Sequence, residues 1–227
     1  MLSPKLLETL RYYWLAVRPK GWLFEGDIPG INTLGRILEV VSDQCERFLE
    51  ERIFKPLGMS DTFFFPPPEK YDRITSVYDL RNGKLTRADI DLHRVGSRYT
   101  SALGGLFSTA SDMAAFYQMM LRRGVHNGRR ILSQRSVDVM TALHTGYLPP
   151  TAPGMGYGLG WEVVRDPRGA LRGTSIGSYG HGGAYGTYGW VDPKADLVGV
   201  FLIQRASGGA PDERNAFMQM LASAIVD

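Results

Sequence analysis

The sequence predicts an α+β fold, in which a helical part comes first and an antiparallel sheet with one helix packed on it follows. Three observations support this prediction. Before residue 145, apolar residues recur at the three- and four-residue spacing of helices. From residue 157, short apolar and glycine-rich runs separated by turn residues replace that spacing, which indicates strands. The last segment is helical again, and a helix that follows a run of strands packs on their sheet in α+β proteins.

Capped amphipathic segments dominate the first half of the chain. The expected helices cover residues 3–18, 32–41, 42–57, 111–123 and 133–143. Ser42, Ser111 and Ser133 are the expected N-caps of the last three, because a serine hydroxyl accepts a hydrogen bond from a free N–H of the first turn. Gly58 fits the left-handed position that ends a helix. Cys45 lies at core spacing in the third helix.

Strand and turn patterns fill the rest of the chain. Asn82-Gly83 predicts a tight hairpin turn between extended segments at 74–80 and 84–86, since both residues tolerate positive φ. The three prolines at 66–68 predict an extended linker. Further strands are expected at 157–164, 179–186 and 197–204. The closing helix is expected over 214–226, with the inward side chains Phe217, Met220, Leu221 and Ile225.

Composition indicates one large or two small globular domains. The 227 residues are 44% hydrophobic and 22% charged, and Lys+Arg 26 against Asp+Glu 23 gives a net charge of +3. This weak, scattered positive charge indicates a solvated surface, and no nucleic-acid partner is expected. No apolar run reaches the roughly 18 residues of a membrane span. Glu8 and Arg11 interrupt the apolar start, which predicts no signal peptide and a cytoplasmic location.

Metal and cofactor sites are not expected. The four histidines are dispersed, without cysteine partners or i, i+4 pairing. Cys45 is the single cysteine, which excludes an internal disulfide. Neither a Walker A pattern nor G-x-G-x-x-G between a strand and a helix is present, so the sequence predicts no phosphate-binding loop.

The run YGHGGAYG at residues 179–186 is the strongest candidate for a functional site. Its glycines remove side chains from one strand edge, so another backbone or a ligand can approach closely. A bare edge that faces a cleft can hydrogen-bond an extended acyl substrate and point an N–H at an oxyanion. His181 is the polar side chain of this run. The alternative interpretation is a histidine whose hydrogen bonds are satisfied within a strand.

A G-x-S-x-G match at residues 173–177 offers Ser175 as a nucleophile. That motif needs a sharp strand-to-helix turn that exposes the serine, whereas here the chain runs directly into the glycine-rich strand. A small-residue loop is therefore the favoured interpretation, and a nucleophilic Ser175 is the minor alternative.

Four further runs carry a family likeness. They are GINTLGRILEVVS at residues 30–42, FLEERIFKPLGMSDT at 48–62, GGLFSTASDM at 104–113 and GYGLGW at 156–161. Together with His181-Gly182-Gly183, they resemble the serine β-lactamase and penicillin-binding protein superfamily. The most similar branch contains class C β-lactamases, DD-peptidases and family VIII carboxylesterases. In that branch the third catalytic motif, Lys-Thr-Gly in β-lactamases, is often His-Gly-Gly or His-Thr-Gly.

The resemblance implies a β-lactamase/transpeptidase-like fold and acyl transfer by a serine, with a lysine and a tyrosine sharing the general-base work. The partner would be a small-molecule acyl substrate, namely a β-lactam, peptide or ester, and no cofactor is implied. His181 would lie near the substrate carboxylate or leaving group, and the Ala184 N–H would donate to the oxyanion. Gly182, Gly183 and Tyr185 would line the bound substrate.

The sequence departs from the family in two of its three catalytic motifs. No serine is followed by lysine three residues later, and Glu-Gly-Asp-Ile-Pro occupies residues 25–29, where Tyr-x-Asn is expected. Residues 3–26 are instead similar to a segment of tyrosine recombinases and transposases. These departures predict a foreign segment at 1–29, joined by gene fusion to a truncated, partial β-lactamase-like domain at 30–227.

Three functions follow from these observations. The first is a family hydrolase without acyl-enzyme chemistry, inactive or very weak. The second is an active esterase or β-lactamase that uses a substitute serine, Ser175, Ser178 or Ser101, beside His181. The third is a binding or assembly protein that pairs through an open sheet edge, for example as a homodimer. A serine hydroxyl within hydrogen-bond reach of His181 would favour the second.

Overall fold

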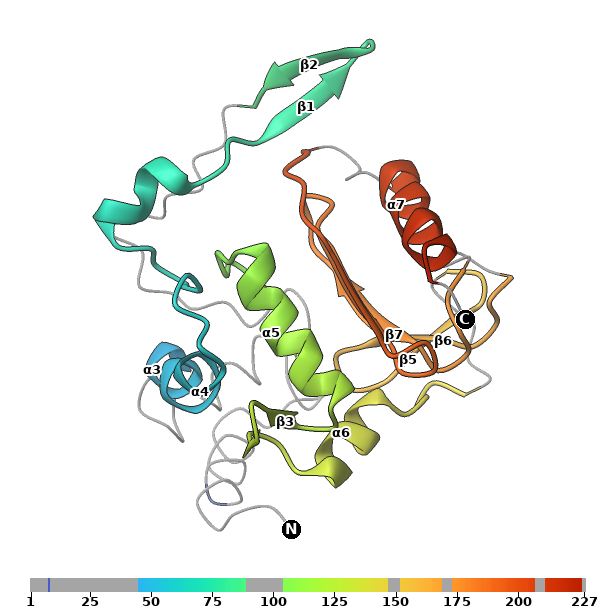
Figure 1. Cartoon of the computed structure of the whole chain (residues 1–227). Helices are drawn as coiled ribbons and strands as arrows, with labels where there is room; N and C mark the ends of the chain where they lie inside the picture. Colours follow the sequence, from blue (N-terminus) through green and yellow to red (C-terminus); the bar gives the residue numbers. More distant parts are fainter. Residues whose placement is uncertain are drawn as a thin grey trace.

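The computed structural model describes Glu8 and residues 45–88, 104–146, 152–168, 173–206 and 211–225. In this part of the chain, helices lie on both sides of a five-stranded antiparallel sheet (Figure 1). The predicted α+β class, with helices before the sheet and one after it, is confirmed. Apart from Glu8, the helices expected at 3–18 and 32–41 lie outside the described residues.

The strands of the main sheet follow one another in chain order, each antiparallel to its neighbour. They are β5 Met155–Tyr157, β6 Glu162–Val164, β7 Tyr179–Gly182, β8 Tyr188–Asp192 and β9 Leu197–Phe201. All five residues of β8 are buried, so the core is centred on this strand.

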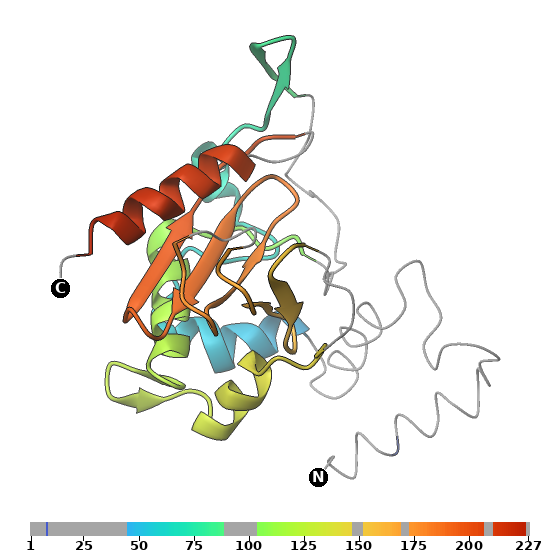
Figure 2. The same ribbon diagram turned by 90° about the vertical axis from the view of Figure 1, so that its right-hand side faces the viewer.

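One long helix covers each face of the sheet (Figures 1 and 2). Helix α5 (Ala110–Leu121) packs on one face and α7 (Pro211–Ser223) on the other. The core beneath α5 includes Tyr117, Met119, Met120, Trp161, Val163, Tyr179 and Val191. The core beneath α7 consists of Met155, Val164, Tyr188, Trp190 and Met218. Alternation along the strands divides the apolar side chains between the two cores.

The segment from Cys45 to Leu57 is helical throughout, as expected. Helix α3 (Cys45–Leu49) continues as a π-helix (Glu50–Phe54) and then as α4 (Lys55–Leu57). Gly58 ends the helix at φ 72°, the left-handed conformation predicted for it. Cys45 is buried, in agreement with its helical spacing.

The helix caps confirm one prediction and correct another. Ser133 caps α6 (Gln134–Thr141) as predicted, and its Oγ accepts a hydrogen bond from the Ser136 N–H at 2.9 Å. The prediction that Ser111 caps the helix expected at residues 111–123 was wrong. Thr109 caps α5, and its Oγ1 accepts from the Asp112 N–H at 3.2 Å. Thr109 is followed three positions later by the acidic Asp112, as in a capping box, whereas Ser111 is followed at that spacing by Ala114.

Two small hairpins lie outside the main sheet. Strands β1 (Tyr78–Arg81) and β2 (Lys84–Arg87) pair across the predicted turn, where Asn82 and Gly83 adopt φ 50° and 75°. Strands β3 (Val125–His126) and β4 (Arg129–Arg130) form the second hairpin. The proline run is extended only in part, because Pro68 begins a 3-10 helix that ends at Arg73. The fixed φ of proline suits that first turn.

Several predicted strands were too long. Residues 158–161 interrupt the strand expected at 157–164, and Gly160 adopts φ 78° there. The strand expected at 179–186 ends at Gly182, because residues 183–187 form the turn to β8. The strand expected at 197–204 ends at Phe201.

The closing helix begins at Pro211, earlier than predicted, and presents a different residue to the core. Met218 is buried, whereas Met220 is 73% exposed and Ile225 is 43% exposed. Phe217 still packs edge-on against Trp190. None of the helices within the described ranges has the length and apolar character needed to cross a membrane.

Candidate active site

Two glycines in the middle of the sheet allow close packing. A Cβ at Gly180 would lie 2.4 Å from the Gly189 carbonyl oxygen, and a Cβ at Gly189 would lie 2.2 Å from the Tyr117 ring. Both positions therefore exclude any side chain. The bare edge predicted from the sequence is provided by Gly182 and Gly183, which are exposed.

Tyr117 joins α5 to the sheet beside the candidate histidine. Its ring lies edge-on to Trp161, which lies edge-on to Tyr179, with centroids 5.8 and 5.2 Å apart. Burial raises the pKa of the Tyr117 phenol to about 12, so this hydroxyl stays protonated at neutral pH. Gly189, on which Tyr117 rests, pairs directly with His181. The aromatic contacts therefore fix the sheet next to His181.

His181 lies on the α5 side of the sheet, and its ring is exposed. Tyr179, two residues earlier, packs in the core beneath α5, and side chains two residues apart share a face. The ring Nδ1 lies 2.8 Å from the Gly182 carbonyl oxygen. Because a carbonyl only accepts, Nδ1 carries the proton in the neutral ring and Nε2 is an acceptor. Among the described residues, nothing hydrogen-bonds to Nε2.

Strand β7 has an open edge beyond Gly180. Strand β6 pairs with β7 at Tyr179 and Gly180, and its pairing ends there. Backbone groups of successive residues point to opposite sides of an antiparallel strand, so Gly182 directs its N–H to the same side as Gly180. No described strand pairs with that side of Gly182. This edge can accept an extended ligand.

Ala184 adds a second backbone donor, although it lies in the turn and not in the strand where we expected it. The Gly183 N–H donates to the Thr187 carbonyl at 2.8 Å and closes the turn. The Tyr185 carbonyl accepts from the Arg205 N–H at 2.9 Å, which joins the turn to the chain after β9. Ala184 is exposed, and no described residue accepts a hydrogen bond from its N–H.

The structure does not bring Ser175 to His181. The Ser175 N–H donates to Asp192 Oδ2 at 2.8 Å. Asp192 ends β8 and lies three residues beyond Gly189, the partner of His181. Three residues of strand span about 10 Å. Ser175 and His181 therefore lie at opposite ends of the β7–β8 pair.

The other candidate serines do not meet His181 in the described structure either. Ser178 is 1% exposed, and strand alternation directs its side chain toward α7, away from the face of His181. Its hydroxyl forms no hydrogen bond with the described residues. Ser101 lies outside the described residues. Of the serine hydroxyls in the described ranges, none hydrogen-bonds to His181.

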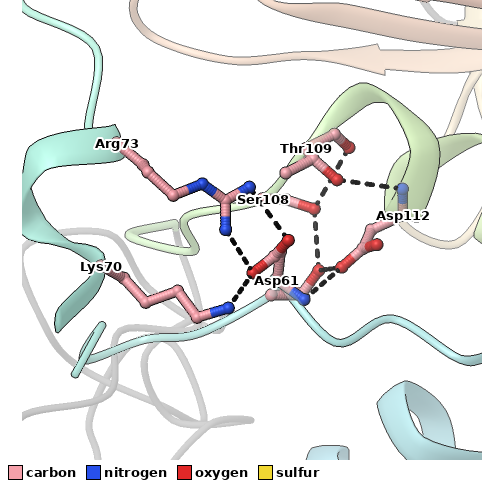
Figure 3. A network of polar contacts seen from close by, with 7 residues as sticks. Asp61, Lys70, Arg73, Ser108, Thr109 and Asp112 are labelled. Atoms are coloured by element: carbon pink, nitrogen blue, oxygen red, sulfur yellow. Dashed lines mark hydrogen bonds and ion pairs between the residues drawn. The ribbon is translucent and has the colours of Figure 1, made fainter.

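A polar network at the start of α5 joins two of the family-like runs (Figure 3). Asp112 Oδ2 accepts hydrogen bonds from the Asp61 N–H and the Thr62 hydroxyl, each at 2.8 Å. The Ser108 hydroxyl lies 2.8 Å from that of Thr62. One carboxylate thus holds residues 61–62 against the first turn of α5, the helix that carries Tyr117 to the sheet.

The Asp61 side chain faces two cations (Figure 3). Arg73 donates to both of its oxygens at 2.8 and 3.0 Å, and Lys70 forms an ion pair with it. The hydrogen bonds from Arg73 and Lys70 lower the pKa of Asp61 to about 2. This network was not predicted, although Thr109-x-x-Asp112 is a recognisable capping pattern.

Across the described ranges, His, Cys, Asp and Glu side chains form no group of three or more that could hold a metal ion.

Comparison with known proteins identifies the family. The model of the Beta-lactamase family matches residues 25–223. This chain belongs to the beta-lactamase family. The matched residues include β7 with the His-Gly-Gly sequence. The boundary predicted between residues 29 and 30 lies outside the described residues and stays a prediction.

The relatives of this beta-lactamase-family chain are longer than it is. It is 34% identical over 188 residues to protein Rv1367c of Mycobacterium tuberculosis, covering 77% of this chain and 47% of that protein. It is 29% identical over 230 residues to lovastatin esterase of Penicillium rubens, covering 89% and 55% of the two chains. The chain therefore spans about half the length of these curated relatives.

A solved structure confirms the fold of this beta-lactamase-family chain. EstCE1, described as a hydrolase with promiscuous acyltransferase activity, matches with a TM-score of 0.71 at 24% identity. The match covers 85% of this chain and 54% of EstCE1. At this identity the likeness shows the fold alone.

Proposed function

We propose that the edge of β7 from His181 to Ala184 binds acyl compounds of the family's substrate classes, β-lactams, peptides or esters. We further propose that this chain performs the acyl-enzyme step very weakly or not at all. One observation carries the proposal: two backbone donors and a histidine acceptor meet at an exposed edge where no described serine hydroxyl is bonded to His181. The name of the related lovastatin esterase supports esters as one substrate class.

The groups at this edge suit binding and polarisation of a carbonyl. The N–H groups of Gly182 and Ala184 can donate to a carbonyl oxygen and to the oxyanion that develops from it. The Nε2 of His181 can accept a hydrogen bond from the leaving group or a bound water. Loss of the nucleophile from a coupled catalytic set removes most of the rate enhancement, and the oxyanion donors leave a residual part.

A substitute serine is the competing hypothesis. Ser175 lies about 10 Å along the sheet from His181, and Ser178 is buried on the opposite face. Ser101 is the remaining candidate named from the sequence.

Active-site labelling separates the two hypotheses. Purified protein is incubated with a fluorophosphonate probe and with a fluorescent penicillin, and adducts are located by mass spectrometry. The proposal expects no stoichiometric adduct, and nitrocefin and p-nitrophenyl acetate turnover no higher than in His181→Ala. A stoichiometric adduct on one serine that disappears in its alanine variant would overturn the proposal and identify the nucleophile.

The edge of β9 favours a second function, assembly with another copy of the chain. No described strand pairs with the outer side of β9. The run LVGVFLI at 197–203 contains neither the charges nor the proline that protect exposed edges. Antiparallel pairing of two copies about Gly199 would place Val198 of one copy opposite Val200 of the other.

Light scattering tests this assembly. Ladder alternation directs the N–H of Val200 away from β8, so Val200→Pro removes an outer donor and keeps the β8–β9 bonds. We expect a dimer in the unsubstituted protein and a monomer in Val200→Pro. Leu159→Lys, an exposed position away from β9, is the control and should stay dimeric. A monomeric unsubstituted protein would contradict the assembly hypothesis.

A further inference from the structure

We propose that the apolar face of the β1–β2 hairpin binds the acyl chain of a substrate whose carbonyl is held at Ala184. The inference rests on the proposed function and narrows its substrate class to esters and amides of long-chain acyl groups. Three features of the hairpin support it: the exposed apolar face, the backbone link to the turn between β7 and β8, and the placement of the charges.

The hairpin exposes three large apolar side chains on one face. Leu80 pairs directly with Leu85, and Tyr78 lies two residues before Leu80, so all three share a face. Their exposed fractions are 43% for Tyr78, 41% for Leu80 and 63% for Leu85. Figure 1 shows the hairpin standing out from the main sheet near the end of β9. This face is therefore open to solvent in the described structure.

Backbone hydrogen bonds connect the hairpin to the candidate site. The Tyr78 N–H donates to the Gln204 carbonyl at 3.0 Å, and the Ala206 N–H donates to the Tyr78 carbonyl at 2.7 Å. Between these two residues, the Arg205 N–H donates to the Tyr185 carbonyl at 2.9 Å. Two distances between adjacent hydrogen-bonded backbones, about 10 Å in all, therefore separate Tyr78 from Tyr185, the residue that follows Ala184. An acetyl group cannot span this gap, whereas a dodecanoyl chain can.

The Leu80–Leu85 centre of the apolar face is uncharged, although Arg87 lies at one end of that face, opposite Tyr78. Arg81 and Lys84 pair next to the turn, and Arg81 is hydrogen-bonded to Asp79 at 2.7 Å. Asp79 and Arg81 occupy the opposite face from Leu80, because strand neighbours alternate. An alkyl chain laid along Leu80 and Leu85 toward Tyr78 would remove apolar surface from water. The exposed Arg87 beside Tyr78 can keep its guanidinium in water while its methylene groups border the chain.

A chain-length series of ligands tests the inference without requiring catalysis. N-acylglycines from acetyl to dodecanoyl are titrated into ¹⁵N-labelled protein, and the amide signals of Gly182 and Ala184 are followed. We expect binding to tighten by about tenfold or more from acetyl to dodecanoyl, because added methylenes are buried. In Leu80→Asp/Leu85→Asp that gain should disappear, while binding of N-acetylglycine stays unchanged.

Matched variants keep the test specific. Ile176→Asp replaces an apolar residue that is 67% exposed before β7, at the end of the strand far from Ala184, and should keep the full chain-length gain. If the double variant loses its native near-ultraviolet spectrum, Leu85→Asp alone replaces it, because Leu85 is the most exposed of the three.

Three results would overturn the inference while leaving the proposed function standing. They are an equal chain-length gain in the double variant, no gain in the unsubstituted protein although N-acetylglycine shifts Ala184, and a dimer that dissociates in the double variant. The last result would show that a second copy covers the hairpin face. If N-acetylglycine shifts neither Gly182 nor Ala184, the proposed function fails, and this inference fails with it.

Discussion

The two ends of the β7–β8 pair use similar polar groups in opposite ways. At one end, the buried Asp192 carboxylate accepts hydrogen bonds from the N–H groups of Ser175, Lys194 and Ala195, at 2.8, 3.1 and 3.1 Å. At the other end, the ring of His181 and the N–H of Ala184 are exposed, and no described residue accepts from that N–H. Buried polar groups must be paired, whereas exposed unpaired donors are available to a ligand. The first end is therefore structural, and the second is the candidate site.

The contact between Gly189 and the Tyr117 ring joins α5 to the sheet beside His181, so breaking it should have the largest effect. Gly189→Ala places a Cβ 2.2 Å from the Tyr117 ring and should lower the free energy of unfolding by about 3 kcal/mol. Urea unfolding measures this change. Gly182→Ala is the matched control, since its Cβ would lie 3.2 Å from the Tyr188 ring, which would need to shift by only a few tenths of an ångström, and should cost about 1 kcal/mol or less. Equal losses in the two variants would contradict the packing account.

Removing the principal side chain at each end tests the comparison itself. Asp192→Ala leaves the Ser175, Lys194 and Ala195 N–H groups without their acceptor and should cost about 1–3 kcal/mol of unfolding free energy. His181→Ala removes an exposed ring and should change that free energy by no more than about 0.5 kcal/mol. Thermal and urea unfolding of both variants give the answer. A His181→Ala loss as large as that of Asp192→Ala would show that His181 is a structural residue.

Local sequence signals predicted the parts of this molecule that depend on neighbouring residues. The Asn82-Gly83 turn, the Ser133 cap and the Gly58 helix end all follow from backbone preferences that act within a few positions. In each case the residue types themselves restrict φ or supply the hydrogen bond.

Contacts between distant segments were not predictable in this way. The packing of the Tyr117 ring on Gly189 was not expected, because that contact joins α5 to β8 across a long stretch of chain. Met218 replaced Met220 in the core because the docking angle of α7 on the sheet decides which helix face is buried. The Asp112 contact with Asp61 spans 51 residues, so neither run reveals it alone.

The smallest expected effect concerns acid stability at the Asp61 network. The Asp61 pKa of about 2 in the folded protein lies below the ordinary value of 3.8. The ionised carboxylate therefore contributes stability above about pH 4 that is lost as the pH falls toward 2. In Asp61→Asn the urea midpoint should fall less steeply between pH 5 and pH 2 than in the unsubstituted protein, and Arg73→Gln should lie between them. The same pH dependence of the urea midpoint in all three proteins would contradict the assignment of the low pKa to Asp61.

The most direct test of the account is an amide-resolved titration of ¹⁵N-labelled protein with benzylpenicillin. We predict saturable, reversible shifts of the Gly182 and Ala184 signals, no shift of the Ser175, Lys194 and Ala195 signals, and unchanged protein mass afterwards. Loss of these shifts in His181→Ala would place the histidine at the bound ligand. Shifts confined to the Asp192 end, or a covalent penicilloyl adduct on a serine, would contradict the account.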